Sequence, residues 1–125
     1  MSEQTKVLVI DDDPAICISV KAILEANGYQ AFTALSGKEG LELFRQVNPD
    51  IVLCDMMMED IDAGARVAKI IKEERPELPV FLLSTIGEAT ARTIGLDELG
   101  FNGVFQKPVN FDLLLNVLDK HRKKS

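Results

Sequence analysis

Four short groups of polar residues in this sequence carry side chains that could do chemistry together. They are Asp11-Asp12-Asp13, Asp55, Ser84-Thr85 and Lys107. Carboxylates that crowd into one place repel one another, so they either take up protons or recruit a divalent cation. Oxygen ligands that leave room for water suit Mg²⁺. A carboxylate nucleophile, a hard cation, a hydroxyl and an ammonium together suit phosphoryl transfer, provided that the fold brings them to one site.

Taken singly, each of these groups has an ordinary structural explanation. An acidic triplet is commonly a solvated turn, and Asp13 before Pro14 is typical of a helix N-cap. Asp55 could be a turn residue, Ser84 could satisfy backbone groups, and Lys107 could extend along the surface. The chemical interpretation therefore depends on the elements that position the four groups.

Short apolar runs alternate along the chain with patterns of helical spacing. The apolar runs predict strands at 7–10, 31–35, 51–54, 80–83 and 104–106. Apolar spacing and capping residues predict helices at about 16–24, 36–47, 67–71, 88–99 and 111–118. Strands that alternate with helices predict right-handed crossovers, and hence a parallel sheet covered by helices on both faces.

The predicted fold class is α/β, a doubly wound, flavodoxin-like three-layer sandwich with a five-stranded parallel sheet of order 2-1-3-4-5. In this order the first and third strands are neighbours at the topological switch point, and ligands bind beyond their carboxyl ends. Each of the four polar groups directly follows a predicted strand. We therefore expect all of them at one edge of the sheet.

Length and composition favour a single domain over residues 1–125. A chain of 125 residues with 46% hydrophobic and 27% charged residues can bury a core of its own. The net charge of −6 argues against nucleic acid or anionic lipid as a direct partner. The segment 1–6 lacks the apolar core of a signal peptide, and no apolar run approaches the roughly 18 residues of a membrane span. A cytoplasmic location is expected.

The two cysteines and the one histidine offer little metal-binding chemistry. Cys17 and Cys54 lie among apolar residues, which predicts buried, reduced thiols rather than a disulfide framework. His121 has no second histidine and no CxxC motif to complete a zinc site.

The motifs at the predicted strand ends resemble the receiver domain of two-component response regulators, over essentially the whole chain. The matching segments are Val9-Ile10-Asp11-Asp12-Asp13-Pro14, Asp55 with Met58 three residues later, Ser84-Thr85 and Lys107-Pro108. The resemblance implies phosphorelay signal transduction, in which a histidine kinase or phosphotransfer protein passes a phosphoryl group to this chain. It implies a signalling phosphoacceptor rather than an enzyme, acting on a downstream effector protein or on an output domain that this sequence lacks.

The resemblance also implies a role for each matching residue, with Asp55 as the phosphoacceptor. The ligands implied for Mg²⁺ are Asp11, Asp12, Asp55 and the backbone carbonyl of Met57. Ser84 would hydrogen-bond one phosphoryl oxygen, and Lys107 would pair with another. Lys107-Pro108 is a candidate for a cis peptide bond.

The family pattern is broken at Glu59 and Thr85, which are predicted to line the implied site, and at Val104. Glu59 stands where the family usually has proline, and Thr85 stands where it usually has a small residue, so Thr85 could narrow the approach to Asp55. Val104 replaces an aromatic residue that moves inward upon phosphorylation in many receivers, so switching would rely on the fourth strand and helix. Phe105 is expected to point to the other face of the sheet.

Met57 and Ile86 are predicted to line the implied site, two residues past Asp55 and Ser84 respectively. Both are apolar and should hinder the positioning of an attacking water molecule. A long-lived phosphorylated state is the predicted consequence.

Two alternatives stay open at this level. One is a Mg²⁺-dependent phosphatase resembling the haloacid dehalogenase group, with Asp11 as nucleophile and Asp13 as general acid. It fits less well, because Ala15 stands where that group has Thr or Val and because Asp55 is left without a role. The other alternative is a receiver fold that serves as a docking module without being phosphorylated.

Overall fold

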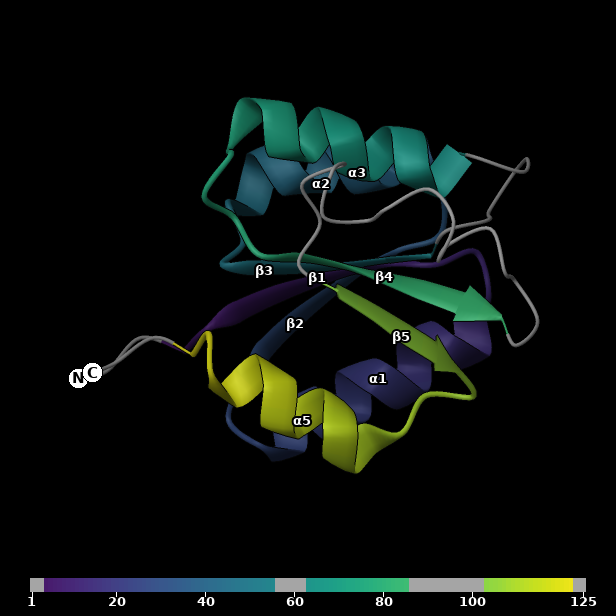
Figure 1. Cartoon of the computed structure of the whole chain (residues 1–125), viewed down its shortest axis with the longest axis vertical. Coiled ribbons are helices and arrows are strands. Elements are labelled where there is room, and N and C mark those ends of the chain that lie inside the picture. The colour runs from purple at the N-terminus through teal and green to yellow at the C-terminus, as the bar shows by residue number, and fades with distance from the viewer. Residues whose placement is uncertain (1–3, 56–62, 86–102, 123–125) are drawn as a thin grey trace.

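A five-stranded parallel sheet lies between two layers of helices in the computed structural model, which describes residues 4–55, 63–85 and 103–122 (Figure 1). The strands are β1 (Lys6–Ile10), β2 (Gln30–Ala34), β3 (Ile51–Asp55), β4 (Val80–Thr85) and β5 (Gly103–Lys107). The helices are α1 (Pro14–Ala26), α2 (Gly37–Val47), α3 (Ala63–Glu74) and α5 (Phe111–Asp119). The sheet order is β2-β1-β3-β4-β5, which confirms the predicted doubly wound α/β fold. The helix predicted at 88–99 lies outside the described residues.

The strands that carry candidate residues run further than the sequence predicted. β3 continues through Asp55, β4 through Thr85 and β5 through Lys107. Each added residue still pairs with a neighbouring strand, because Asp55 lies opposite Leu83 and Thr85 lies opposite Lys107. These side chains therefore belong to the last residues of the strands instead of following them. Backbone pairing holds them more firmly than a loop would.

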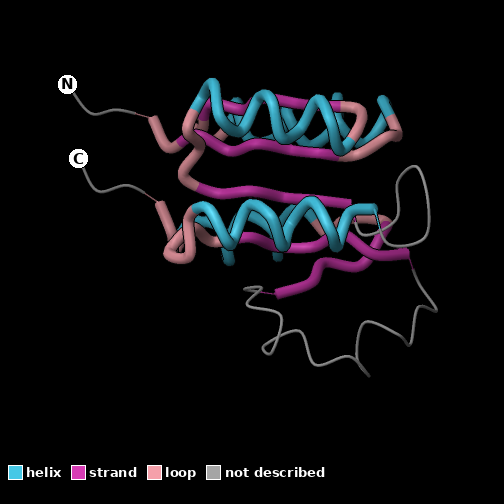
Figure 2. Tube along the Cα trace, turned by 90° about the horizontal axis from the view of Figure 1, so that it is seen from above, coloured by secondary structure: helices cyan, strands magenta, loops and turns pink. Residues whose placement is uncertain are grey.

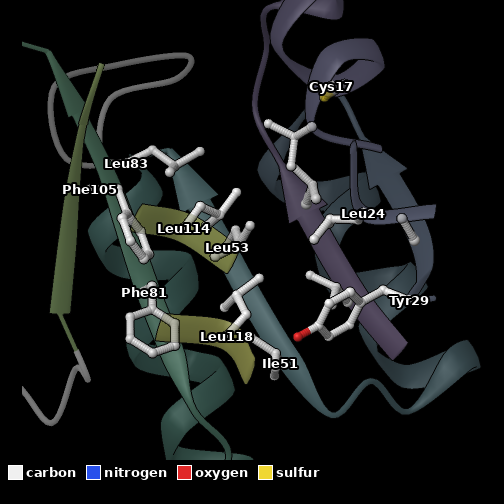
Figure 3. Packing of buried hydrophobic residues seen from close by; sticks show 14 residues of the cluster. Cys17, Leu24, Tyr29, Ile51, Leu53, Phe81, Leu83, Phe105, Leu114 and Leu118 are labelled. Carbon is white, nitrogen blue, oxygen red and sulfur yellow. The ribbon is translucent and has the colours of Figure 1, made fainter. Parts of the chain in front are cut away.

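The alternation of side chains along each strand divides the buried residues into two cores. One lies between the sheet and helices α2 and α3, and it includes Leu8, Ile10, Phe44, Val52, Ile71 and Leu82. The other lies between the sheet and helices α1 and α5, and it includes Val9, Leu24, Leu53, Phe81, Phe105 and Leu114 (Figure 3). Val104 packs against the first core and Phe105 belongs to the second, which confirms that these neighbours face opposite sides of the sheet.

Polar residues cap the N-termini of α1, α2 and α5. Asp13, Ser36 and Asn110 each accept a hydrogen bond from a backbone N–H in the first turn of α1, α2 and α5 respectively, which confirms the N-cap predicted at Asp13. β2 ends one residue earlier than predicted, so Leu35 lies outside the strand and is exposed. Among the described helices, none has the length and apolar character needed to cross a bilayer.

Gly40 allows α2 to approach the end of β1 closely. A Cβ atom at this position would lie 2.6 Å from Cδ1 of Ile10, which is too close for any ordinary packing contact. Ile10 is the last residue of β1 and immediately precedes Asp11. The close packing of α2 therefore supports the backbone that presents the first carboxylate.

Polar contacts fasten the end of α5 to the turn between α1 and β2. Figure 2 shows that the start of β1 and the end of α5 lie at the same end of the sheet. The Tyr29 hydroxyl donates to Asp119 Oδ1 at 2.5 Å, and the Arg122 guanidinium lies 4.4 Å from the centroid of the Tyr29 ring. Arg122 also donates to the backbone carbonyl of Asn27 at 2.8 Å. Gly28 has a φ of +88°, and a side chain there would collide with Arg122.

Tyr29→Phe is expected to lower the free energy of unfolding by about 1–2 kcal/mol, because it removes a hydrogen bond to a carboxylate and keeps the buried ring. Burial and the Asp119 carboxylate raise the pKa of Tyr29, so the hydroxyl stays a donor at neutral pH. Urea unfolding followed by circular dichroism measures the change. A double-mutant cycle with Asp119→Asn provides the control, and strictly additive effects of the two substitutions would contradict the pairing.

Candidate functional site

Three carboxylates meet where the carboxyl ends of β1 and β3 lie side by side. Asp11 and Asp12 directly follow β1, and Asp55 is the last residue of β3. One oxygen from each side chain lies within 4.8 Å of the other two. Asp11 is 0% exposed and Asp55 is 5% exposed, whereas Asp12 is open to solvent. The sequence correctly predicted that these side chains lie together, and the group is strongly negative with one side facing water.

Asp11 is held in place by hydrogen bonds from its surroundings. Its backbone N–H donates to the carbonyl of Ala34 at 3.0 Å, which continues the pairing of β1 with β2 past the end of the strand. The N–H of Asp13 donates to Asp11 Oδ1 at 2.9 Å. The Cys17 thiol donates to the backbone carbonyl of Asp11 at 3.3 Å, a contact that the sequence did not predict. The carboxylate is therefore oriented before any ligand binds.

Lys107, at the end of β5, supplies the counter-charge inside this acidic group. Its Nζ lies 2.9 Å from Asp11 Oδ2 and 3.3 Å from Asp55 Oδ1, and its side chain is only 13% exposed. Burial alone would lower the pKa of Lys107, but the two carboxylates outweigh burial and raise this pKa above its usual value. Lys107 is thus an ammonium at neutral pH. The Lys107-Pro108 peptide bond is cis, as predicted.

Asp11 also offers an oxygen that suits a metal ion. Its Oδ2 is buried and, within the described parts of the chain, accepts no well-aligned hydrogen bond, although the Lys107 ammonium is close by. With two further carboxylates nearby and an open side at Asp12, the donor set fits a hard divalent cation that keeps some of its water. The acidic group could therefore bind a metal.

The remaining candidate strand, β4, lies between β3 and β5. Ser84 is buried, with 4% of the residue exposed, and pairs in register with Gln106 of β5. Asp55 lies opposite Leu83, the residue before Ser84, so the backbone places Ser84 at the same edge of the sheet as Asp55. This placement agrees with the sequence prediction.

Several predicted site residues lie outside what the structure describes. Met57, Glu59 and Ile86 fall in the undescribed segments, and for Thr85 only the backbone is described. The predicted metal contact of the Met57 carbonyl, and the predicted lining of the site by Glu59, Thr85 and Ile86, stay predictions.

The two cysteines adjoin the carboxylates but do not take part as thiolates. Both are free and buried, as predicted. Burial, reinforced by Asp11, raises the pKa of Cys17 to about 11. Burial and the neighbouring Asp55 raise the pKa of Cys54 as well. Both thiols are therefore protonated at neutral pH, and neither offers a thiolate to a metal ion.

Comparison with known proteins identifies the family. The family model for the response regulator receiver domain matches residues 7–119. The chain is 32% identical to the DNA-binding dual master transcriptional regulator RpaA of Synechocystis, over 88% of this chain and 46% of that protein. It is 30% identical to protein PilH of Pseudomonas aeruginosa, over 91% of this chain and 94% of that protein. The chain spans about half, or less, of the length of the first curated relatives that it matches.

Solved structures show the same relationship. The chemotaxis protein CheY4 of Vibrio cholerae is 27% identical, with a TM-score of 0.84 over 94% of this chain and 98% of that chain. A response regulator receiver domain protein from Clostridium thermocellum is 30% identical, with a TM-score of 0.84 over 94% of this chain and 93% of that one. The similarity thus covers sequence and fold together.

The resemblance to haloacid-dehalogenase-like phosphatases is not favoured. Asp11, the nucleophile in that alternative, is fully buried and accepts the N–H of Asp13 on Oδ1. Asp13, the general acid in that alternative, is occupied as the N-cap of α1 and accepts the N–H of Ala15 at 2.9 Å. Sequence, fold and site geometry agree, and the chain belongs to the response regulator receiver domain family of two-component systems.

Proposed function

We propose that the chain is a single receiver domain whose Asp55 accepts a phosphoryl group in a phosphorelay, with Mg²⁺ as the cofactor. The observation that supports this most strongly is the buried Asp55 carboxylate beside two further carboxylates and the Lys107 ammonium, in a chain of the receiver family. The donor is a histidine kinase or a histidine phosphotransfer protein. The signal passes to a downstream effector or to an output domain, and the protein acts in the cytoplasm.

In the proposed reaction, a carboxylate oxygen of Asp55 attacks the phosphorus of the donor phosphohistidine. The new P–O bond forms as the P–N bond breaks, and the imidazole leaves with the electron pair of that bond. The chain promotes only its own phosphorylation and dephosphorylation, so it is a signalling phosphoacceptor and not an enzyme that turns over a separate substrate. The product is an acyl phosphate that places new negative charge at the ends of β3, β4 and β5.

Charge neutralisation is the main task of the neighbouring residues. The proposed Mg²⁺ ligands are Asp11, Asp12, Asp55 and the backbone carbonyl of Met57. Bound Mg²⁺ supplies positive charge that offsets the negative charge of the transferring group. The Lys107 ammonium pairs with one phosphoryl oxygen, and the Ser84 hydroxyl donates to another. Both residues stand at strand ends next to Asp55, so little reorganisation is needed.

Asp55→Asn is expected to abolish phosphorylation, because an amide cannot act as the nucleophile. Wild-type protein incubated with Mg²⁺ and a small acyl phosphate should gain the mass of one phosphoryl group per chain by intact-protein mass spectrometry. The gain should disappear when EDTA removes the metal, and it should persist in the control Asp112→Asn, which changes an exposed carboxylate on α5.

Other outcomes of the same experiment would contradict the proposal. Repeated turnover of the phosphodonor that depends on Asp11 would indicate a phosphatase. No modification from any donor, a phosphohistidine protein included, would indicate a docking module.

Ser84→Ala is expected to slow the phosphorylation of Asp55 by roughly tenfold or more, since a hydrogen bond to a charged group contributes about 1.5–3 kcal/mol. Ser84→Thr keeps the hydroxyl and serves as the matched control, with a rate close to that of the wild type. The rate is measured from the time course of the mass gain. Equal rates in wild type and Ser84→Ala would remove Ser84 from the proposed site.

Replacing Met57 or Ile86 by Asn is expected to shorten the lifetime of the phosphorylated state by roughly tenfold or more, because a polar side chain can position an attacking water molecule. The loss of phosphate from purified phosphoprotein gives the half-life directly. A wild-type half-life of seconds that neither substitution changes would refute a protective role for these apolar residues.

A further inference from the structure

Asp11 lies just past the end of β1, where the pairing of β1 with β3 has stopped. The last pair of these two strands is Ile10 with Cys54, whereas Asp55, the other buried carboxylate, is still a paired residue of β3. The N–H of Asp11 donates to the carbonyl of Ala34 at 3.0 Å, which ties its backbone to β2. The orientation of Asp11 depends further on contacts from the segment that follows it.

That segment closes a ring of hydrogen bonds on Asp11. The N–H of Asp13 donates to Asp11 Oδ1 at 2.9 Å, which holds the carboxylate. The carbonyl of Asp13 accepts the N–H of Cys17 at 3.2 Å, in the first turn of α1. The Cys17 thiol donates back to the carbonyl of Asp11 at 3.3 Å, and its sulfur lies 3.9 Å from the carbonyl oxygen of Ala34. The side chain and the backbone of Asp11 are thus tied to the same turn.

Cys17 can hold Asp11 because the position of Cys17 is itself fixed. The residue is buried, and it belongs to the same apolar cluster as Val20 and Leu24 of α1. A thiol is a weak donor, so one such bond contributes modestly to stability. The ring nevertheless makes this bond count for the site, because it joins the backbone of Asp11 to the turn that also holds its carboxylate.

We propose that Cys17 is a positioning residue of the metal site: its thiol closes the ring and so fixes the Asp11 carboxylate in the orientation that binds Mg²⁺. The inference rests on the proposed function, because it concerns Asp11 as a metal ligand. It gives a task to a buried thiol that takes no part in the proposed phosphoryl transfer. Loss of the donor should loosen Asp11 in the metal-free protein and weaken Mg²⁺ binding, whereas loss of core volume alone should do neither.

Amide hydrogen exchange, followed by NMR in EDTA, tests the ring without metal. The readout is the N–H of Asp13, because its exchange requires its bond to Asp11 Oδ1 to open. Cys17→Ala should speed this exchange by roughly threefold to tenfold, as expected for the loss of one hydrogen bond. Cys17→Ser keeps a donor and should stay within about twofold of the wild type.

Val20→Ala is the matched control for core volume. It removes side-chain atoms from the same buried cluster, one turn further along α1, and leaves the ring intact. It should lower the stability of the fold and keep the exchange rate of the Asp13 N–H within about twofold of the wild type.

Isothermal titration calorimetry of Mg²⁺ into the full chain gives a second readout. The dissociation constant should rise by roughly threefold to tenfold in Cys17→Ala and stay within about twofold of the wild type in Cys17→Ser and Val20→Ala. Cys17→Val fills the space and lacks the donor, so it replaces Cys17→Ala if circular dichroism shows that the alanine variant does not fold.

Wild-type values of either quantity in the variant without a donor would overturn the inference. Losses in Cys17→Ser or Val20→Ala as large as those in Cys17→Ala would overturn it too, because volume and not the donor would then be responsible. A wild-type chain that binds no Mg²⁺ would instead refute the metal site of the proposed function, and the exchange of the Asp13 N–H would still decide whether Cys17 holds Asp11. The two failures are therefore distinguishable.

Discussion

Asp11 and Asp55 are buried carboxylates held side by side at one edge of the sheet, and Asp12 adjoins them from the solvent side. Removing such charges from water costs several kcal/mol each unless opposite charge is supplied close by. The Lys107 ammonium supplies positive charge beside both of them. The site thus depends on positive charge that offsets its buried carboxylates. Any event that changes the charge of either sign acts on the ends of β1, β3 and β5 together.

The surrounding fold makes this crowding possible. β1 and β3 are flanked on both faces by apolar cores, so their carboxyl ends cannot move apart without disturbing tightly packed residues. Gly40 brings α2 against the end of β1, and the amide of Asp13 holds one oxygen of Asp11. At the other end of the sheet, the contacts of Tyr29 with Asp119 and Arg122 hold the end of α5. Packing and capping therefore hold the carboxylates in place against their mutual repulsion.

Patterns in the sequence were sufficient to predict the sheet order and the edge at which the functional residues gather. Apolar runs have a clear periodicity, and the carboxyl ends of parallel strands must share one edge. The orientation of Val104 and Phe105 toward opposite faces of the sheet was also predictable, because side chains alternate along a strand. The predicted positions of the strand ends were less accurate. Pairing between strands, and not the local sequence, decides that Asp55 and Lys107 still belong to the sheet.

Contacts between distant side chains could not be predicted in this way. The pairing of Lys107 with Asp11 depends on how far a long, flexible side chain reaches across β3 and β4. The hydrogen bond between Tyr29 and Asp119 joins residues 90 positions apart, and no periodicity marks it. The contact of the Cys17 thiol with the Asp11 carbonyl requires the docking of α1 against the end of β1. Such contacts arise only in the assembled fold, and the one between Lys107 and Asp11 helps set the charge of the site.

Mapping the phosphorylated residue tests the account most directly. Reduction of the acyl phosphate with borohydride, followed by peptide mass spectrometry, marks the carboxylate that was modified. We expect modification at Asp55 alone, and only when Mg²⁺ is present during the reaction. Modification at Asp11 or Asp12, or equal modification of Asp55 in EDTA, would contradict it.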